Sequence, residues 1–306
     1  MALHGVRSLT LGVPDVDAAA GFYRDFGLQD CGDGWFATAD GGRQLQLSHA
    51  PTRRLLRAAF AADDRDDLVR IQAGLARLGF LAEVAGDVLT TADPGTGTPI
   101  CVVVSERLQQ PPAAPFVVNG PGRIQRVGVR AAGVVDTSRV RPRRLGHFVL
   151  GTADYEQSRA FFVDGLGFKV SDEVRDVGVF LRCSTDHHNV LLQRAPVPFI
   201  HHSSWQVDDV DTIGRGAMRM LADHPERHVW GLGRHYAGSN FFWYLKDPAG
   251  NFAEYHSDMD CIPEDSLWTP EVLEGARGLY LWGPPPPPSF IDPEDLADLM
   301  IHGHST

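Results

Sequence analysis

The sequence contains few cysteines and no long apolar run, and both absences exclude classes of protein. Its four cysteines lie far apart and form no C-x-x-C pair: Cys31, Cys101, Cys183 and Cys261. Such spacing favours free thiols in a reducing cytoplasm over a disulfide framework. No apolar run approaches the ~20 residues of a membrane-spanning helix, and the first residues lack the apolar segment and cleavage site of a signal peptide. We therefore expect a cytoplasmic protein without a membrane partner.

Positive charge is also scarce, since 28 Lys and Arg face 39 Asp and Glu, for a formal net charge of −11. Nucleic-acid binding requires Lys and Arg gathered on one face, so nucleic acid is not an expected partner. In other respects the composition, with 43% hydrophobic and 22% charged residues, is typical of a globular protein. The 306 residues predict about two domains, each large enough to bury a core.

An internal repeat indicates the architecture. The segment RSLTLGVPDVDAAAGFYRDFGL reads as a strand, a helix begun by Asp and a glycine turn. The same pattern recurs as RLGHFVLGTADYEQSRAFFVDGLGF, with Asp15 aligned to Asp154. A weaker second pair is AAFAADDRDDLVRIQAGLARLGF and SSWQVDDVDTIGRGAMRMLADHP. The repeat predicts an α+β fold of four βαβββ modules in two barrel-like halves.

The halves are expected to join in the Pro- and Gly-rich stretch 111–122 or in the RVRPRR run before Leu145. The predicted division is a metal-free N-terminal domain over 1–120, a catalytic domain over 121–262 and a tail over 263–306. Five consecutive prolines predict a stiff, extended segment in the tail. A short helix should follow, with Asp292 as its N-cap and Pro293 at its first position. A docked tail is the expectation, and an SH3-type ligand is the alternative.

One acidic residue, Glu254, lies in the strand-like run NFAEYHS. Burying an unpaired charge is very costly, and coordination of a metal ion is one reason to do so. Two upstream histidines fit as partners: His147 and His202 each lie seven residues before an Asp, Asp154 or Asp209, that opens a predicted helix. Two His and one carboxylate, with open coordination positions, are typical of non-haem Fe(II) oxygen chemistry.

The spacing of the three residues forms no local motif, and a lone His on an apolar strand is more often a hydrogen-bonded structural residue. The repeat provides an internal control. In the N-terminal half Ser8, Arg57 and Ile100 fall at the corresponding positions. Scattered losses would be expected of ordinary core residues, whereas joint loss is expected of a half without a metal.

Further polar residues cluster around this set in the sequence. His187 and His188 precede the strand of His202, while His235 and Tyr244 precede Glu254. A His beside a metal can transfer protons near neutral pH. The alternatives are that the two adjacent histidines form an exposed turn and that Tyr244 is an ordinary aromatic strand residue.

Four motifs together resemble the type I extradiol ring-cleavage dioxygenases of the vicinal oxygen chelate superfamily: LGHFVLGTAD, HHNV, IHHSSWQV and GRHYAGSNFFWYLKDPAGNFAEYHSD. The resemblance covers most of the chain. It implies a two-domain fold whose C-terminal half holds Fe(II), or occasionally Mn(II), and whose N-terminal half is a metal-free duplicate. It also implies a homo-oligomer that cleaves a catecholic ring with O₂ to a hydroxymuconic semialdehyde-type product.

Carried over by position, the resemblance implies three metal ligands: His147, His202 and Glu254. His188 rather than His187 matches the acid/base His of the family, because it lies 14 residues before His202. His235 and Tyr244 match residues that contact the catecholic oxygens. The segment around Glu254 is most similar to that of enzymes acting on single-ring substituted catechols or trihydroxytoluenes.

Two positions depart from the family pattern and leave the substrate open. Val149 stands where some relatives have Asn, and Gly238 stands where others have Asp. The superfamily fold also hosts non-redox, glyoxalase-like metal enzymes and metal-free proteins that bind small molecules. An isomerase has no need of His188, His235 and Tyr244 together, and a metal-free protein has no need of an acid at 254. The residues therefore favour the dioxygenase.

Overall fold

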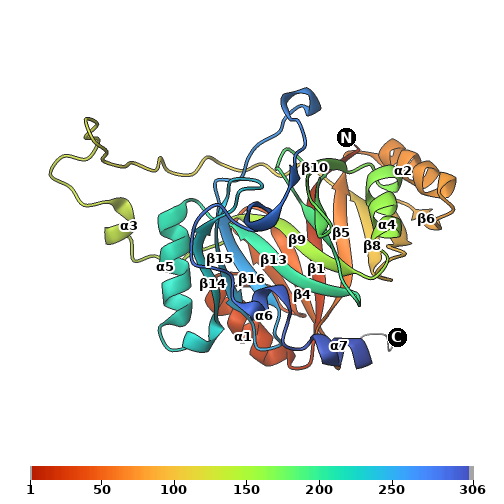
Figure 1. Cartoon of the computed structure of the whole chain (residues 1–306), viewed down its shortest axis with the longest axis horizontal. Coiled ribbons are helices and arrows are strands. Elements are labelled where there is room, and N and C mark those ends of the chain that lie inside the picture. Colours follow the sequence, from red (N-terminus) through yellow and green to blue (C-terminus); the bar gives the residue numbers. More distant parts are fainter. Residues whose placement is uncertain (1, 303–306) are drawn as a thin grey trace.

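The computed structural model describes residues 2–302, and four βαβββ units follow one another along it (Figure 1). The first comprises β1 (Leu3–Val13), α1 (Val16–Phe26), β2 (Gln29–Asp30), β3 (Trp35–Thr38) and β4 (Gly42–His49). The second comprises β5 (Arg54–Ala62), α2 (Arg65–Arg77), β6 (Ala82–Ala85), β7 (Val88–Ala92) and β8 (Pro99–Val104). The third comprises β9 (Arg144–Thr152), α4 (Tyr155–Ala160), the π-helical turn η1 (Phe161–Gly165), β10 (Lys169–Val174), β11 (Gly178–Arg182) and β12 (Val190–Arg194). The fourth comprises β13 (Phe199–Gln206), α5 (Val210–Leu221), η2 (Pro225–Arg227), β14 (His228–Arg234), β15 (Phe241–Lys246) and β16 (Phe252–Ser257).

An aspartate N-cap starts the helix of every unit. The carboxylate accepts a hydrogen bond from the backbone N–H three residues on, which satisfies one of the free donors of the first turn. These caps are Asp15, Asp64, Asp154 and Asp209. The predicted repeat of strand, Asp-started helix and further strands is therefore confirmed, with Asp15 as the first cap.

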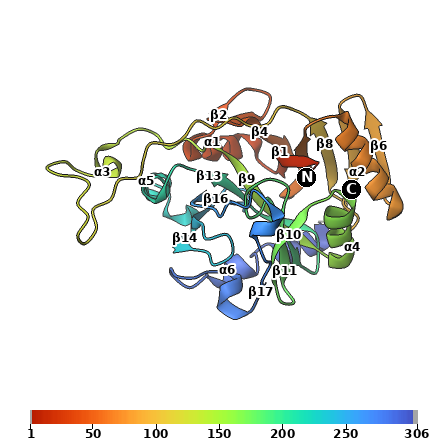
Figure 2. The ribbon, with the colours of Figure 1, turned by 90° about the horizontal axis from the view of Figure 1, so that it is seen from above.

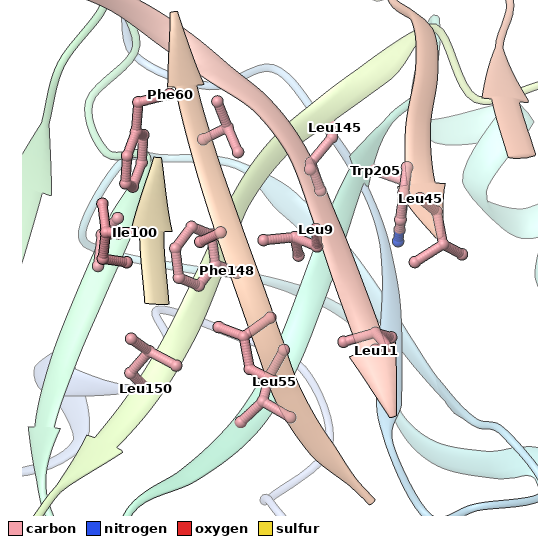
Figure 3. Packing of buried hydrophobic residues seen from close by; sticks show 14 of the residues in the cluster. Leu9, Leu11, Leu45, Leu55, Phe60, Ile100, Leu145, Phe148, Leu150 and Trp205 are labelled. Atoms are coloured by element: carbon pink, nitrogen blue, oxygen red, sulfur yellow. The ribbon is translucent and has the colours of Figure 1, made fainter. Parts of the chain in front are cut away.

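The units pair into two mixed sheets. The first has the strand order β2-β3-β4-β1-β5-β8-β7-β6, and the second has β14-β15-β16-β13-β9-β12-β11-β10-β17, where β17 is Val272–Leu273. One hydrophobic cluster joins them, with Leu9 and Phe60 of the first sheet against Phe148 and Trp205 of the second (Figure 3). The two sheets thus share a core, and the opposite face of the second sheet lies outside that core.

A β-bulge at Gly146 decides which way the side chains of β9 point. Ser204 of β13 pairs with His147, but its neighbour Trp205 pairs with Leu145, so Gly146 is an additional residue. A bulge reverses the alternation of faces. Leu145 accordingly lies in the core (Figure 3), while His147 faces away from it. Simple alternation along the strand predicts that Leu145, His147 and Val149 share a face. The bulge makes this prediction wrong for Leu145, whereas Val149 lines the same cavity as His147.

Residues 105–143 connect the two sheets and contain only one short helix, α3 (Ala132–Val135). Helix α3 lies against α5. The part between β8 and α3 extends away from the body in both views (Figures 1 and 2). No described helix is both long and apolar enough to cross a membrane.

The tail contains η3 (Asp265–Leu267), β17, η4 (Gly275–Gly278), α6 (Pro288–Ile291) and α7 (Leu296–His302). It is docked, since Phe290 is buried against the second sheet. The predicted helix begins later than expected, at Leu296, and Asp292 is the C-cap of α6 rather than an N-cap. The physical reason is that burial of Phe290 places the first helical turn before Pro293 instead of after it.

Candidate metal centre and active site

Three predicted ligands meet on the face of the second sheet opposite the core. His147 of β9, His202 of β13 and Glu254 of β16 are buried, and their ligand atoms all lie within 4.8 Å of one another. The strands are neighbours, and their register pairs Glu254 with Ser204 and Ser204 with His147. Residues paired across neighbouring strands share a face. The sheet therefore brings together residues that lie far apart in the sequence.

The second ligand strand has its own bulge. Ile200 of β13 pairs with Leu150, whereas His202 pairs with Val149, so His201 is an additional residue. Ile200 consequently packs in the core and His202 faces the site. Two bulges thus set two imidazoles on the outer face, and neither bulge was foreseen from the alternation of the sequence.

The Glu254 carboxylate lies at the centre of this group. Its Oε2 lies 3.1 Å from Nε2 of His147 and 3.6 Å from Nε2 of His202. Neither contact is aligned as a hydrogen bond, and Oε2 is buried without a partner within residues 2–302. A buried carboxylate oxygen left in that state is costly. Two imidazole nitrogens and this oxygen facing one point fit a divalent cation such as Fe(II) or Mn(II).

Electrostatics favours the metal-binding protonation state of His202. Burial, followed by the neighbouring histidines, holds the pKa of His202 well below its usual value. A metal binds the neutral imidazole. The other oxygen of Glu254, Oε1, accepts a hydrogen bond of 3.3 Å from the amide of Asn240. That bond holds one carboxylate oxygen and leaves the second directed at the histidines.

A cavity of about 430 Å³ opens beside the three ligands. His188, His235 and Tyr244 line it together with His147 and His202, whereas His187 does not. The remaining wall is mainly apolar: Val149, Val174, Phe180, Leu191, Ala237, Leu279, Phe290 and Ile291. A concave, mainly apolar pocket with a few convergent polar groups is the usual form of a small-molecule site.

His188 is buried, so the alternative of an exposed turn is wrong. Its ring centroid lies 4.2 Å from that of His147. Burial holds the pKa of His188 well below its usual value, and the neighbouring histidines lower it further. The lowered pKa favours a neutral imidazole at this position, beside His147 in the cavity wall.

His235 and Tyr244 form a hydrogen-bonded pair in the wall of the same cavity. Nδ1 of His235 contacts the carbonyl oxygen of Leu279, which can only accept, so this nitrogen carries the proton. Nε2 of His235 then accepts a hydrogen bond of 2.9 Å from the hydroxyl of Tyr244. Burial raises the pKa of Tyr244 well above its usual value, which keeps the phenol protonated as a donor. Tyr244 also packs on Trp230 and Phe290, so its ring has a structural role as well.

Sequence reasoning missed several polar residues that support this site. Ser204 and Nδ1 of His256 lie within 2.7 Å and share a hydrogen bond. The ring of His256 occupies the space above Gly146, where a Cβ would come within 2.4 Å of it. Asn240 was missed too. The only signal was that Ser204 and His256 each lie two residues after a predicted ligand in the sequence.

The N-terminal half carries a different set at the matching positions. Pairing of β1, β5 and β8 places Ser8 and Arg57 as expected, but it places Cys101 rather than Ile100 opposite Ala59, where Glu254 lies opposite Ser204. The expected Ile100 is wrong by one residue, because the turn before β8 is one residue longer. Ile100 packs in the core. Among the described residues, no second group of potential metal ligands accompanies the first.

Comparison with known proteins places this geometry in a family. Residues 144–255 match the model of the Glyoxalase/Bleomycin resistance protein/Dioxygenase superfamily. The chain is 31% identical over 304 residues to metapyrocatechase 2 of Cupriavidus necator, covering 95% of this chain and 92% of that one. This chain belongs to the extradiol ring-cleavage dioxygenases of that superfamily. The predictions of family and of a ring-cleavage dioxygenase are thereby confirmed.

Two further relatives bear on the metal and the fold. An iron-dependent extradiol dioxygenase of Rhodococcus jostii (strain RHA1) is 30% identical over 154 residues, or 45% of this chain and 50% of that one. The solved structure of the Mn(II)-bound glyoxalase from Novosphingobium aromaticivorans superposes with a TM-score of 0.71 at 28% identity, covering 94% of this chain and 95% of that one. The predicted two-domain vicinal oxygen chelate fold is confirmed.

Proposed function

We propose that this dioxygenase holds Fe(II), or alternatively Mn(II), on His147, His202 and Glu254 and there cleaves a catecholic ring with O₂ outside the diol. The observation that carries the proposal is the buried Oε2 of Glu254, which faces two imidazole nitrogens and has no hydrogen-bond partner in the described chain. A metal ion satisfies all three groups at once. The product is a hydroxymuconic semialdehyde-type compound.

When bound, the metal would supply a redox-active centre for catechol and O₂ and Lewis acidity that lowers the pKa of a coordinated phenol. The remaining work falls to the residues of the chain. Tyr244 donates to His235 in the structure, and its hydroxyl can turn to a catechol oxygen instead. The freed Nε2 of His235 is then an acceptor for the second phenol. This pair would orient the diol and remove its proton.

His188 also lines the cavity, with its ring against that of His147. We assign it the transfer of a proton to and from the reacting oxygens, since its buried ring lies against the predicted ligand His147 and lines the cavity. The apolar side chains around it exclude water, which strengthens each hydrogen bond within the site. A neutral imidazole is the form that can take up a proton before it returns one.

The cavity supports a single-ring substrate with small apolar substituents. Its volume of about 430 Å³ is near the lower end of ligand pockets. Val149, Leu191 and Phe290 form apolar walls, and the charged residues Arg194 and Asp292 also line the cavity. A substituted catechol or trihydroxytoluene would match these walls.

The test is anaerobic purification with metal analysis, followed by addition of catechol, 3-methylcatechol and a trihydroxytoluene in air. About one iron per chain, O₂ uptake equal to substrate consumed and a yellow product would support the proposal. A tightly held metal without O₂ uptake on any catechol would favour the alternative of a glyoxalase-like, non-redox metal enzyme. Absence of metal would favour a small-molecule binding protein.

We further propose that the chain forms a homo-oligomer through the extended segment 111–131. This segment contains three Arg and no acidic residue, in a chain of net charge −11. Arg143 anchors its first residue through the carbonyl oxygen of Pro111, and the hydrogen bonds of Asn119 and Arg126 run within the segment. The segment exposes Ile124 and Val127, at 64% and 81%. A basic, apolar arm complements the acidic body of a second copy.

The assembly is tested by light scattering with the double variant Ile124→Asp/Val127→Asp, which should be smaller than the parent. The matched control is Leu81→Asp, because Leu81 is 90% exposed but lies on the body near α2. An unchanged mass in the double variant would contradict the arm interface.

A cytoplasmic location and the division at about residue 120 are also retained as proposals. All four cysteines are free, which suits a reducing compartment. The strands of the first sheet end at Val104 and those of the second begin at Arg144, which is compatible with domains over 1–120 and 121–262 and a tail over 263–306.

A further inference from the structure

Two pairs of adjacent histidines border the site, and each pair is joined through its Nδ1 atoms. The distance is 3.0 Å between His187 and His188 and 2.8 Å between His201 and His202. All four side chains are buried. A hydrogen bond between two imidazole nitrogens requires one that carries a proton and one that is bare. The groups at the far ends of the two pairs determine which nitrogen is which.

The second pair ends on a backbone carbonyl. Nε2 of His201 lies 2.6 Å from the carbonyl oxygen of Phe290. A carbonyl only accepts, so Nε2 of His201 carries the proton and its Nδ1 is bare. Nδ1 of His202 must then donate, which leaves Nε2 of His202 bare. That is the nitrogen that faces Glu254, as a metal ligand requires.

The first pair ends on a carboxylate. Nε2 of His187 lies 3.0 Å from Oδ2 of Asp172, which is itself 3% exposed. The other oxygen, Oδ1, accepts a hydrogen bond of 2.8 Å from the backbone N–H of Glu271. An ionised carboxylate only accepts, so the same logic applies. His187 carries its proton on Nε2, His188 donates from Nδ1, and Nε2 of His188 is bare.

We infer that Asp172, acting through His187, is a positioning residue that fixes the tautomer of His188 with a bare Nε2 on the cavity side. The inference rests on the proposed role of His188 as a proton acceptor and donor. It assigns a task to two buried polar residues that touch neither the metal ligands nor the substrate cavity. The hydrogen bond to a charged acceptor is also stronger than one to a carbonyl, so the tautomer is held firmly.

Asp172→Asn provides a test with almost no change in volume. The Glu271 N–H still requires an acceptor, so the amide oxygen of Asn turns towards it. The amide NH₂ then faces Nε2 of His187, which must become the acceptor. The protons of both rings are consequently reversed, and Nε2 of His188 gains the proton. One substitution should thus remove the bare nitrogen from the cavity.

The first readout is the tautomer itself, by long-range ¹H–¹⁵N correlation on the full chain labelled with ¹⁵N-histidine and loaded with Zn(II), which is diamagnetic. The His188 signals are assigned by their loss in His188→Phe. The expected result is a proton on Nδ1 in the parent and on Nε2 in Asp172→Asn. A proton on Nε2 in the parent would overturn the inference, even if the variant fails to fold.

The second readout is steady-state kinetics of the iron-loaded enzyme. Asp172→Asn should lose at least about tenfold in kcat, at an unchanged iron content and KM for the catechol, since a proton transfer step contributes about 10²- to 10⁴-fold. The control is Asp265→Asn, a carboxylate of the same region that pairs with Arg182 instead of a histidine. An unchanged kcat and tautomer in Asp172→Asn would overturn the inference. An active His188→Phe would instead overturn the role of His188 and leave the tautomer assignment standing.

Discussion

Arg53, in the N-terminal half, forms an ion pair with Asp295, in the C-terminal tail, through two of its guanidinium nitrogens. A third nitrogen donates a hydrogen bond of 2.7 Å to the carbonyl oxygen of Ile200, directly before the His201–His202 pair. One buried side chain thus links the metal-free half, a ligand strand and the tail. Phe290 and Ile291 of the same tail line the cavity.

Arg53→Ala is therefore expected to loosen the tail and widen the cavity. The variant leaves the Ile200 carbonyl without its donor and removes the ion pair, which should lower the free energy of unfolding by about 2–3 kcal/mol. KM for the catechol should rise more than kcat falls, because the reacting groups stay in place. Urea unfolding measures the free energy of unfolding, and steady-state kinetics measures KM and kcat. The control is Arg57→Ala, at an exposed position of β5, the strand that begins directly after Arg53; an equal effect in the control would contradict the link.

Gly146→Ala should damage the ligand strand. A Cβ at this position would come within 2.4 Å of the His256 ring, and that ring is held by Ser204. Either His256 or the bulge must shift, at a cost of about 1–3 kcal/mol, and the bulge sets the direction of His147. Iron content and thermal stability should both fall. Gly5→Ala on β1 is the control, since nothing lies within 4 Å of its added Cβ.

Much of this arrangement can be predicted from the sequence, because it depends on local signals and on the repeat. The four units and the Asp caps of their helices fall where the sequence placed them, and the three predicted ligands lie together. The bulges at Gly146 and His201 could not be predicted, since they arise from pairing between distant strands. Asp172 was missed for the same reason, because it meets His187 only when β10 folds beside the loop before β12. The later start of α7 depends on the burial of Phe290, a tertiary contact.

His188→Phe should separate metal binding from catalysis. His188 contacts His147 but is not among the three groups that face one another around Glu254. Iron content should stay at the parental value, while kcat falls about 10²- to 10⁴-fold, as expected for loss of a proton-transfer group. Metal analysis gives the iron content and O₂ uptake gives kcat, both measured on one preparation. Full turnover in this variant would contradict the assigned role.

Glu254→Gln should lower the affinity for iron without lowering the stability of the metal-free protein. The amide is a poor metal ligand, so iron affinity should fall by more than the roughly 10–100-fold that loss of a supporting residue costs. The metal-free variant should be at least as stable as the metal-free parent, because a buried carboxylate oxygen without a partner has been removed. Competitive chelation and unfolding in EDTA measure the two effects. Glu173→Gln, which loses only a partly exposed ion pair with Arg159, is the control.

Acid should destabilise the metal-free protein through its buried histidines. Burial lowers the pKa of His201 to about 4, against about 6.5 in an unfolded chain. Between these two pKa values, His201 is protonated in the unfolded state but neutral in the folded state. The free energy of unfolding is therefore highest above about pH 6.5 and decreases as the pH falls towards 4. The loss from this residue approaches about 3 kcal/mol at pH 4, with a slope of at most about 1.4 kcal/mol per pH unit.

Urea unfolding of the EDTA-treated protein at pH 7 and pH 5 measures this loss. The difference in the free energy of unfolding between the two pH values should be smaller for His201→Gln than for the parent. His224→Gln, at a half-exposed position, should keep the parental difference, and equal pH dependence in all three proteins would exclude His201 as a source of the acid sensitivity.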